Sequence, residues 1–185
     1  MLQIRIATQA DASAIWQAEV ETAAIPGHLV SRPGELALKS FEIKIRDLAS
    51  CGRFVVAEHG EVLRGHALLE PMPLEAVRHV SRLTVVVHPG HTGQGVGTAL
   101  VSYLQNHVDR DPKVHKIELL VRASNTSAIR LYRRLGFIEE GRLAQRVRLP
   151  DGTFLDDLAM AWFPTSKAEI TARSLVLTDR RASGY

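Results

Sequence analysis

The residues of this chain with the clearest chemical potential form a glycine-rich turn between a strand pattern and a helix pattern. The β-branched run Val85-Val86-Val87 stops at His88-Pro89, glycines follow at positions 90, 93, 95 and 97, and Thr98-Ala99-Leu100-Val101 opens a helical pattern. Glycine has no Cβ atom, so its backbone can approach an anion closely, and the unpaired first-turn N–H groups of a helix point at that anion. The turn therefore predicts a site for a phosphate-bearing molecule.

Three general interpretations of this turn differ in the residues that they require. A nucleotide P-loop shares the Gly90 to Gly95 spacing, but Val96 stands where that motif requires a lysine. A dinucleotide-binding turn needs an acidic residue at a strand end about 20 residues further on, whereas Glu118 falls inside its strand pattern. A plain glycine turn without a ligand stays open, because short glycine motifs also occur without function.

A second segment, Asn125 to Phe137, adds a helix with its own start and stop signals. Asn125 is a good N-cap residue, and Gly136 is placed to end the helix at the C′ position. The apolar stripe between them is formed by Ala128, Ile129, Leu131, Tyr132 and Leu135.

Together the two segments resemble the GCN5-related N-acetyltransferase (GNAT) family. Its signature is R/Q-x-x-G-x-G/A after a strand, followed one strand later by N-x-x-A-x-x-x-Y-x-x-x-G-F. The chain reads Thr92-x-x-Gly95-x-Gly97 and Asn125-x-x-Ala128-x-x-x-Tyr132-x-x-x-Gly136-Phe137, so the second motif is nearly complete and the first departs at Thr92. The resemblance covers roughly residues 3–163.

The resemblance implies acetyl-CoA as cosubstrate and assigns residues to it. Backbone groups of Val85 and Val87 would pair with the pantetheine arm, and Asn125 would contact the cofactor. Tyr132 would protonate the departing thiolate, and it also belongs to the cofactor site. The amides around the pyrophosphate would be those of Thr92, Gly93, Gln94, Gly95, Gly97 and Thr98, with the Thr98 hydroxyl adding a further bond. Because Thr92 replaces the usual Arg or Gln, one side-chain contact is shortened or absent, and weaker cofactor binding is expected.

A proton acceptor for the attacking amine is harder to assign. Amide formation from a thioester needs a neutral amine, an oriented acyl donor and hydrogen-bond donors for the oxyanion. His79, just before the cofactor strand, is the first choice because histidine titrates near neutral pH. Glu118, Asp156 and Asp157 are the alternatives, and a chain of water molecules could replace all four.

Composition narrows the class of protein and its surroundings. The 185 residues carry a net charge of +3 and one cysteine, Cys51, so no internal disulfide can form and a reducing cytoplasm fits. The charge is too small and too scattered for a nucleic-acid binder, no apolar run is long enough for a membrane span, and the eight histidines show no metal-ligand spacing.

Hydrophobic periodicity predicts the order β-α-α-β-β-β-α-β-α-β-β within a single domain over residues 1–163. The fold class is α/β, and the GNAT resemblance implies a mixed, mostly antiparallel central sheet with splayed central strands flanked by helices. Strands are expected at 3–8, 53–58, 61–70, 79–87, 116–121, 137–149 and 153–162. Four helices are expected: the first begins at residue 11, the second spans 36–48, the third ends at about residue 109, and the fourth begins at residue 125. Residues 164–185 form an extension that could contain a strand over 170–177 and could serve contacts in a homodimer.

The expected activity is transfer of an acetyl group to a primary amine of a small molecule by direct attack in a ternary complex. The runs Ile117–Val121, Glu140–Arg142 and Leu155–Ala161 look like a bacterial subgroup acting on amino acids or similar amines. A non-catalytic acyl-CoA-binding module and a protein N-terminal or lysine acetyltransferase are the alternatives.

Overall fold

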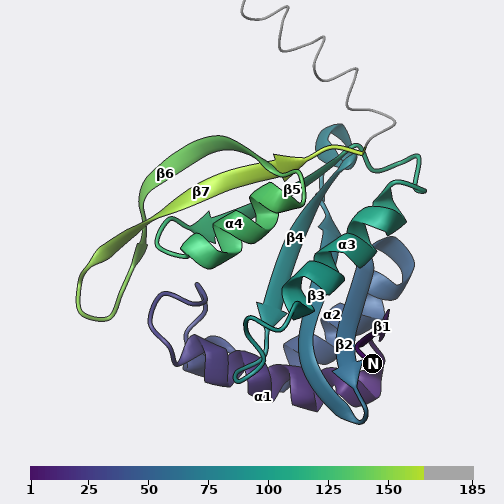
Figure 1. Ribbon diagram of the computed structural model, residues 1–185, viewed down its shortest axis with the longest axis horizontal. Helices are drawn as coiled ribbons and strands as arrows, with labels where there is room; N and C mark the ends of the chain where they lie inside the picture. Colours follow the sequence, from purple (N-terminus) through teal and green to yellow (C-terminus); the bar gives the residue numbers. More distant parts are fainter. Residues whose placement is uncertain (165–185) are drawn as a thin grey trace, which may run out of the picture.

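A computed structural model describes residues 1–164 and contains one seven-stranded sheet with helices on both faces (Figure 1). The strands are β1 (Gln3–Ile6), β2 (Arg53–His59), β3 (Val62–Pro71), β4 (Val80–Val87), β5 (Lys116–Arg122), β6 (Ile138–Arg148) and β7 (Phe154–Trp162). The helices are α1 (Ala12–Ala23), α2 (Leu38–Cys51), α3 (Val96–Val108) and α4 (Thr126–Arg134), with short 3-10 turns at Gln9–Asp11, Pro33–Glu35 and Glu75–Val77. The strand expected over 170–177 lies outside the described residues.

The strands lie in the order β1-β2-β3-β4-β5-β7-β6. Every neighbouring pair is antiparallel except β4 and β5, which run parallel. The expected mixed, mostly antiparallel α/β sheet flanked by helices is therefore confirmed.

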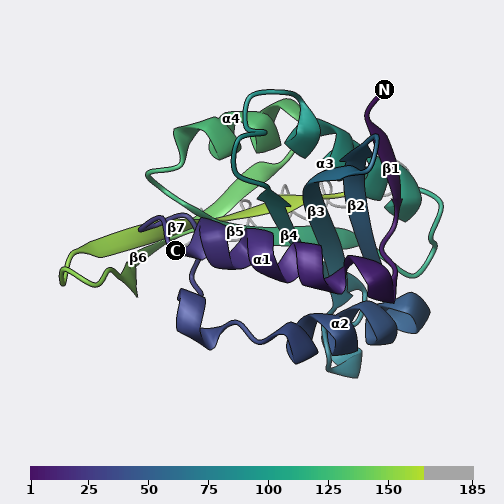
Figure 2. The ribbon, with the colours of Figure 1, turned by 90° about the horizontal axis from the view of Figure 1, so that it is seen from below.

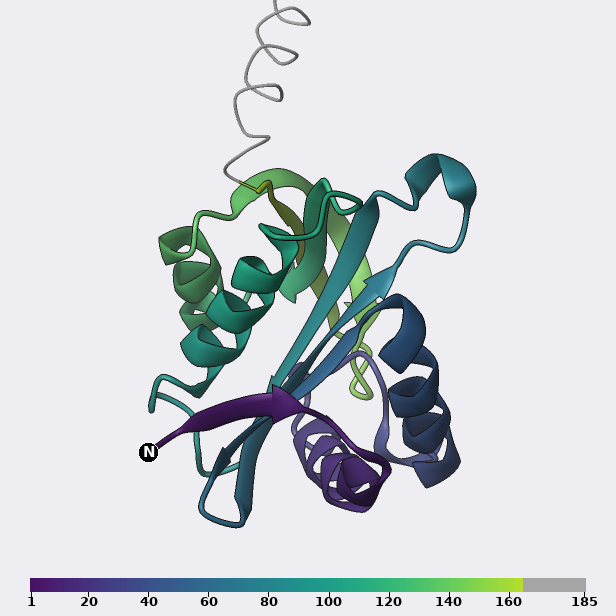
Figure 3. The ribbon, with the colours of Figure 1, turned by 90° about the vertical axis from the view of Figure 1, so that its right-hand side faces the viewer.

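Helices cover the two faces of the sheet in pairs, as Figure 3 shows from the side and Figure 2 from below. On one face α3 packs on β2, β3 and β4, and its Leu100, Val101 and Leu104 are fully buried in the larger hydrophobic core. On the other face α1 and α2 pack on β2 and β3 around a second core that includes Ile15 and Phe41. Residues of alternate parity in each strand fill these two cores, because successive side chains of a strand point to opposite faces.

The two central strands separate after a short parallel stretch. β4 and β5 pair only from Val80 with Lys116 to Arg82 with Glu118. Beyond this point the β5-facing edge of β4 has no strand partner within residues 1–164, although β3 still pairs with β4 as far as Val87. This divergence opens the sheet at its centre, as the resemblance implied.

The boundaries differ slightly from the sequence expectations where local capping decides them. The helix expected from Leu36 begins at Leu38, because Pro33–Glu35 forms its own 3-10 turn, in which the Glu35 carboxylate accepts a hydrogen bond from the Arg32 backbone. The strand expected from His79 begins at Val80.

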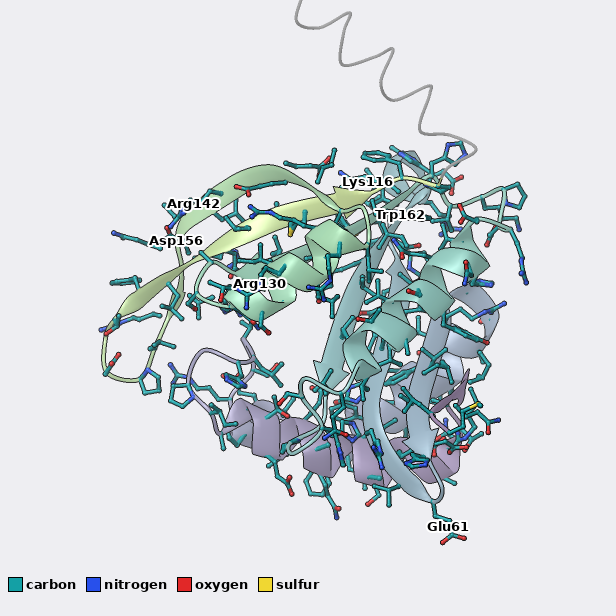
Figure 4. The ribbon with its side chains drawn as sticks, in the orientation of Figure 1. Glu61, Lys116, Arg130, Arg142, Asp156 and Trp162 are labelled. Carbon is teal, nitrogen blue, oxygen red and sulfur yellow. The ribbon has the colours of Figure 1, made fainter. Side chains whose placement is uncertain are left out.

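The β6–β7 hairpin extends beyond the rest of the sheet and is bent by register shifts between Glu139 and Gly141 and between Leu143 and Val147. Asp156 holds the second shift, since its two carboxylate oxygens accept hydrogen bonds from the Gln145 backbone and from Arg142 Nε, each at 2.7 Å (Figure 4). These bonds lower the pKa of Asp156, the backbone bond from Gln145 most of all.

No helix among residues 1–164 is long and apolar enough to span a membrane.

Candidate active site

A cavity of about 530 Å³ opens where β4 and β5 diverge. Its walls come from β4, β5, α2, α4 and the segment between α1 and α2, with one residue each from α1, β2, β3 and β6. Polar side chains that line it include Glu19, Lys44, Arg82, Arg122, Tyr132 and Arg146. The cavity therefore brings together residues that are more than a hundred positions apart in the chain.

The glycine-rich turn leads from the end of β4 to the N-terminus of α3, as expected. Gly90, Gly93 and Gly95 have φ values of 81°, 73° and 80°, a backbone region that other residues rarely adopt. Gly95 is the N-cap residue of α3 and offers no side chain to its first-turn N–H groups. The turn thus combines the conformation and the unpaired donors that a phosphate site requires.

Gln94 and Gly97 have structural roles in this turn that the sequence did not indicate. The Gln94 side chain donates to the Gly90 carbonyl oxygen at 3.0 Å and accepts from Arg64 Nη1 at 3.1 Å, so it fastens the turn to β3. A Cβ atom on Gly97 would lie 3.1 Å from Leu131 Cδ1, so this glycine allows α3 and α4 to approach closely.

Arg64 is a basic residue beside the turn that sequence reasoning missed. Its Nη2 lies 2.7 Å from His59 Nδ1, and its Nε is buried without a hydrogen-bond partner among residues 1–164. Because Arg64 contacts Gln94, its positive charge lies next to the turn in which Thr92 replaces the usual Arg or Gln. Nothing in the strand pattern of β3 singles this arginine out.

Tyr132 and Asn125, the candidates from the second motif, both line the cavity. Asn125 caps α4, since its Oδ1 accepts a hydrogen bond from the Ala128 backbone at 3.1 Å. Tyr132 is 9% exposed, and burial raises the pKa of its phenol to about 12. Its hydroxyl makes no hydrogen bond within the described part of the chain, so it is available to a molecule in the cavity.

None of the four expected proton acceptors is a free group of the cavity. His79 is exposed before β4, does not line the cavity, and packs edge-on against the His115 ring, with centroids 5.9 Å apart. Asp157 forms a buried ion pair with Arg122, and Asp156 holds the β6 bend. Glu118 lies 3.4 Å from Arg82 Nη2.

A buried hydrogen-bonded row of Glu19, His66 and His88 lies beside the cavity instead. Glu19 Oε1 is 2.9 Å from His66 Nε2, and His66 Nδ1 is 2.9 Å from His88 Nε2. His88 Nδ1 donates to the Leu63 carbonyl oxygen at 3.2 Å. Burial first, and the neighbouring His66 second, lower the pKa of His88 to about 4, so this ring is neutral at physiological pH.

Sequence reasoning could not find this row, because its members come from α1, β3 and the segment after β4. The one signal was a histidine at position 66 within an apolar strand pattern. Cys51 is exposed, and its Sγ–H donates a hydrogen bond to the Asp47 carbonyl oxygen. Among residues 1–164, no three His, Cys, Asp or Glu side chains are placed so that together they could hold a metal ion.

Comparison with known proteins agrees with this geometry. The model of the Acetyltransferase (GNAT) family matches residues 16–137. The L-methionine sulfoximine/L-methionine sulfone acetyltransferase of Salmonella typhimurium is 30% identical over 160 residues, which are 84% of this chain and 90% of that enzyme. The spermidine N(1)-acetyltransferase of Vibrio cholerae is 30% identical over 93 residues, which are 50% of this chain and only 53% of that enzyme.

Among solved structures, the acetyltransferase yncA of Salmonella typhimurium, determined with its cofactor acetyl-CoA, superposes with a TM-score of 0.81. It is 23% identical, and the match covers 88% of this chain and 94% of that one. At this level of identity the structural likeness supports the fold alone. The family model matches well over half of the chain and therefore supports membership of the family. The open central strands, the glycine turn and the second motif thus have a common explanation: the chain belongs to the GNAT family of acetyltransferases.

Proposed function

We propose that this protein transfers an acetyl group from acetyl-CoA to the primary amine of a small molecule by direct attack in a ternary complex. The observation that carries the proposal is the cavity between β4 and β5, with the glycine turn at one end of β4 and Tyr132 in its wall. Acetyl-CoA supplies the activated acyl group as a thioester. The residues of the chain have to bind acetyl-CoA and the amine, orient the amine toward the thioester, and protonate the departing thiolate.

The residues fit this cosubstrate in shape and charge. β4 offers unpaired backbone groups beyond Arg82 toward the cavity, and among them Val85 and Val87 would hold the pantetheine arm as an added strand. The amides of residues 92–98 and the Thr98 hydroxyl would surround the pyrophosphate. Arg64 offers positive charge beside the same turn, which would offset part of the contact missing at Thr92.

The chemistry needs no covalent intermediate on the protein. The nitrogen lone pair forms the C–N bond at the thioester carbon, the C–S bond breaks, and a proton from the nitrogen ends on sulfur. A coenzyme A thiol resembles a cysteine thiol with a pKa of about 8.5, so it leaves readily with little help. Orientation in the cavity is therefore expected to account for most of the rate gain.

The charges around the cavity favour an acceptor that carries a carboxylate as well as an amine. Lys44 pairs with Glu70 at 3.3 Å and Arg82 with Glu118 at 3.4 Å. Arg146, from β6, lines the cavity and makes no ion pair within residues 1–164. An unpaired guanidinium suits the carboxylate of an amino acid better than the cationic chain of a polyamine.

The test is a thiol-release assay with acetyl-CoA and a panel of amines: free amino acids, methionine sulfone, spermidine and a short peptide with a free N-terminus. Turnover with the amino acids or the sulfone supports the proposal. The Arg146→Gln variant should raise KM for those substrates tenfold or more, because a charge-assisted hydrogen bond contributes about 1.5–3 kcal/mol. It should leave KM unchanged for spermidine, which has no carboxylate.

Arg148→Gln is the matched control on the same strand. Arg148 does not line the cavity, and its guanidinium lies 6.0 Å from the centre of the Phe154 ring. This variant should keep the wild-type KM. Binding of acetyl-CoA without turnover on any amine would leave the non-catalytic acyl-CoA-binding module, and turnover on the peptide alone would leave a protein acetyltransferase.

A further inference from the structure

The Glu19–His66–His88 row places a hydrogen-bonded carboxylate in the wall of the cavity. His66 is fully buried and His88 is 5% exposed, whereas the Glu19 side chain retains 13% of its surface and lines the cavity. Glu19 Oε2 has no hydrogen-bond partner within residues 1–164 and is not among the fully buried atoms. One carboxylate oxygen is therefore held by the protein, and the other is available from the cavity.

The face of the sheet on which the row lies follows from the strand register. His66 pairs in register with Val86 of β4, and directly opposed residues of an antiparallel pair point to the same face. That face carries α1 and α2, whose connecting segment forms one wall of the cavity. Val86 lies next to Val85, whose backbone we assign to the arm that carries the thioester.

The hydrogen-bond directions fix where protons can lie. The Leu63 carbonyl oxygen can only accept, so His88 carries its proton on Nδ1, and because His88 is neutral its Nε2 accepts from His66 Nδ1–H. An unprotonated His66 Nε2 and an ionised Glu19 would then set two lone pairs 2.9 Å apart. His66 Nε2 and Glu19 Oε1 can therefore form a hydrogen bond only when one added proton lies between them.

We propose that Glu19 receives the amino group of the acceptor and takes up its proton, with His66 and His88 as positioning residues that hold the carboxylate. This inference rests on the proposed acetyl transfer. In the step, one N–H bond of the ammonium ion breaks and its proton binds the Glu19 carboxylate, which leaves a lone pair on nitrogen for the thioester carbon. The second proton lost from nitrogen goes to sulfur, and Glu19 later releases its proton to water.

The shared proton keeps Oε1 on His66, and Glu19 can take up a proton from the amine only while its other oxygen, Oε2, is free of one, so kcat/KM should fall toward low pH. Other titratable or charged groups around the row are few. Those from the surrounding elements are His91 in the glycine turn, His28 and Glu35 between α1 and α2, Lys44 on α2, Arg82 on β4, Arg122 on β5, Tyr132 on α4 and Arg146 on β6. None of them is hydrogen-bonded to Glu19 or His66 in the part of the chain that the structure describes.

The experiment compares Glu19→Gln with Glu21→Gln, an exposed carboxylate two positions along the same helix. Glu19→Gln should lower kcat/KM by about 10²–10³-fold near pH 7, which is the range of general-base catalysis, and should remove the acid limb of the pH profile. Glu21→Gln should leave both unchanged. In His66→Asn the new side chain can still donate an N–H to the Glu19 carboxylate, but it cannot take up a proton. This variant should therefore retain part of kcat and shift the acid limb of the pH profile.

Binding of acetyl-CoA to each variant, measured by calorimetry, shows that the cofactor site is still folded. If Glu19→Gln folds poorly, Glu19→Asp serves instead, and its shorter side chain should lower kcat and keep a displaced acid limb. Wild-type turnover and an unchanged pH profile in Glu19→Gln would overturn the inference alone. No turnover by the wild type on any amine would instead overturn the proposed function.

Discussion

Tyr132 combines burial with a free hydroxyl, and this combination limits how it can act. With a pKa of about 12 the phenol stays protonated at every physiological pH, so it can always donate. It is, however, a weaker acid than a thiol with a pKa of about 8.5, so complete transfer of its proton to the thiolate is uphill. We therefore expect Tyr132 to act mainly by a hydrogen bond to the sulfur as the C–S bond breaks.

The Tyr132→Phe variant should lower kcat by about 10- to 100-fold, the equivalent of one hydrogen bond to a charged group at about 1.5–3 kcal/mol. The affinity for acetyl-CoA should change by less than about twofold, because the hydroxyl matters only as charge develops on sulfur. Steady-state kinetics with calorimetric binding measures both. Tyr103→Phe, a 37% exposed tyrosine on α3, is the control. An unchanged kcat in Tyr132→Phe would remove the assigned role.

Strands β5 and β7 are joined by a buried ion pair between Arg122 and Asp157, which face each other in the register of the sheet. Their side chains are 6% and 1% exposed. Asp157→Ala leaves the guanidinium buried without its partner, so it should lower the free energy of unfolding by about 3–5 kcal/mol in urea denaturation. Asp156→Ala, one position away, should lower it much less, because the hydrogen bonds of Asp156 are exposed to water.

The double variant Arg122→Met with Asp157→Leu tests whether the instability of Asp157→Ala comes from the buried arginine that is left without a partner. Because it removes both charges together, it should recover most of the stability that Asp157→Ala loses. If the double variant is as unstable as Asp157→Ala, the ion pair itself stabilises the fold, and the loss is not explained by an unpaired buried charge.

At the level of helices and strands, the sequence predicted the order correctly because each element carries a local signal. Alternating apolar residues marked the strands, and Asn125 and Gly136 marked the ends of α4. The pairs that build the site left no such signal. Glu19 and His66 are 47 positions apart, and Arg122 and Asp157 are 35 apart, so only the folded sheet brings them together.

The molecule as a whole is divided by the cavity. One part consists of β1–β4 with α1, α2 and α3, the other of β5–β7 with α4, and the sheet joins them through only three paired positions between β4 and β5. The sequence motifs singled out the glycine turn, but they could not show how few paired positions join the two parts, since that depends on where strand pairing stops. His79 was chosen for its intrinsic pKa; it lies just before β4 and is not among the residues that line the cavity, so its role as proton acceptor stays a prediction.

A ligand held between the two parts should therefore stabilise the whole molecule. At a concentration of 100 times Kd, acetyl-CoA should add about 2.7 kcal/mol to the stability and raise Tm by roughly 5–10 °C. Hydrogen exchange should slow most at 83–87 and 119–122, where the strands lack each other as partners. NAD at the same concentration is the control for a generic effect of phosphate. If NAD protects the turn and acetyl-CoA does not, the glycines bind a different class of molecule, because the residues of the turn alone do not distinguish the two pyrophosphates.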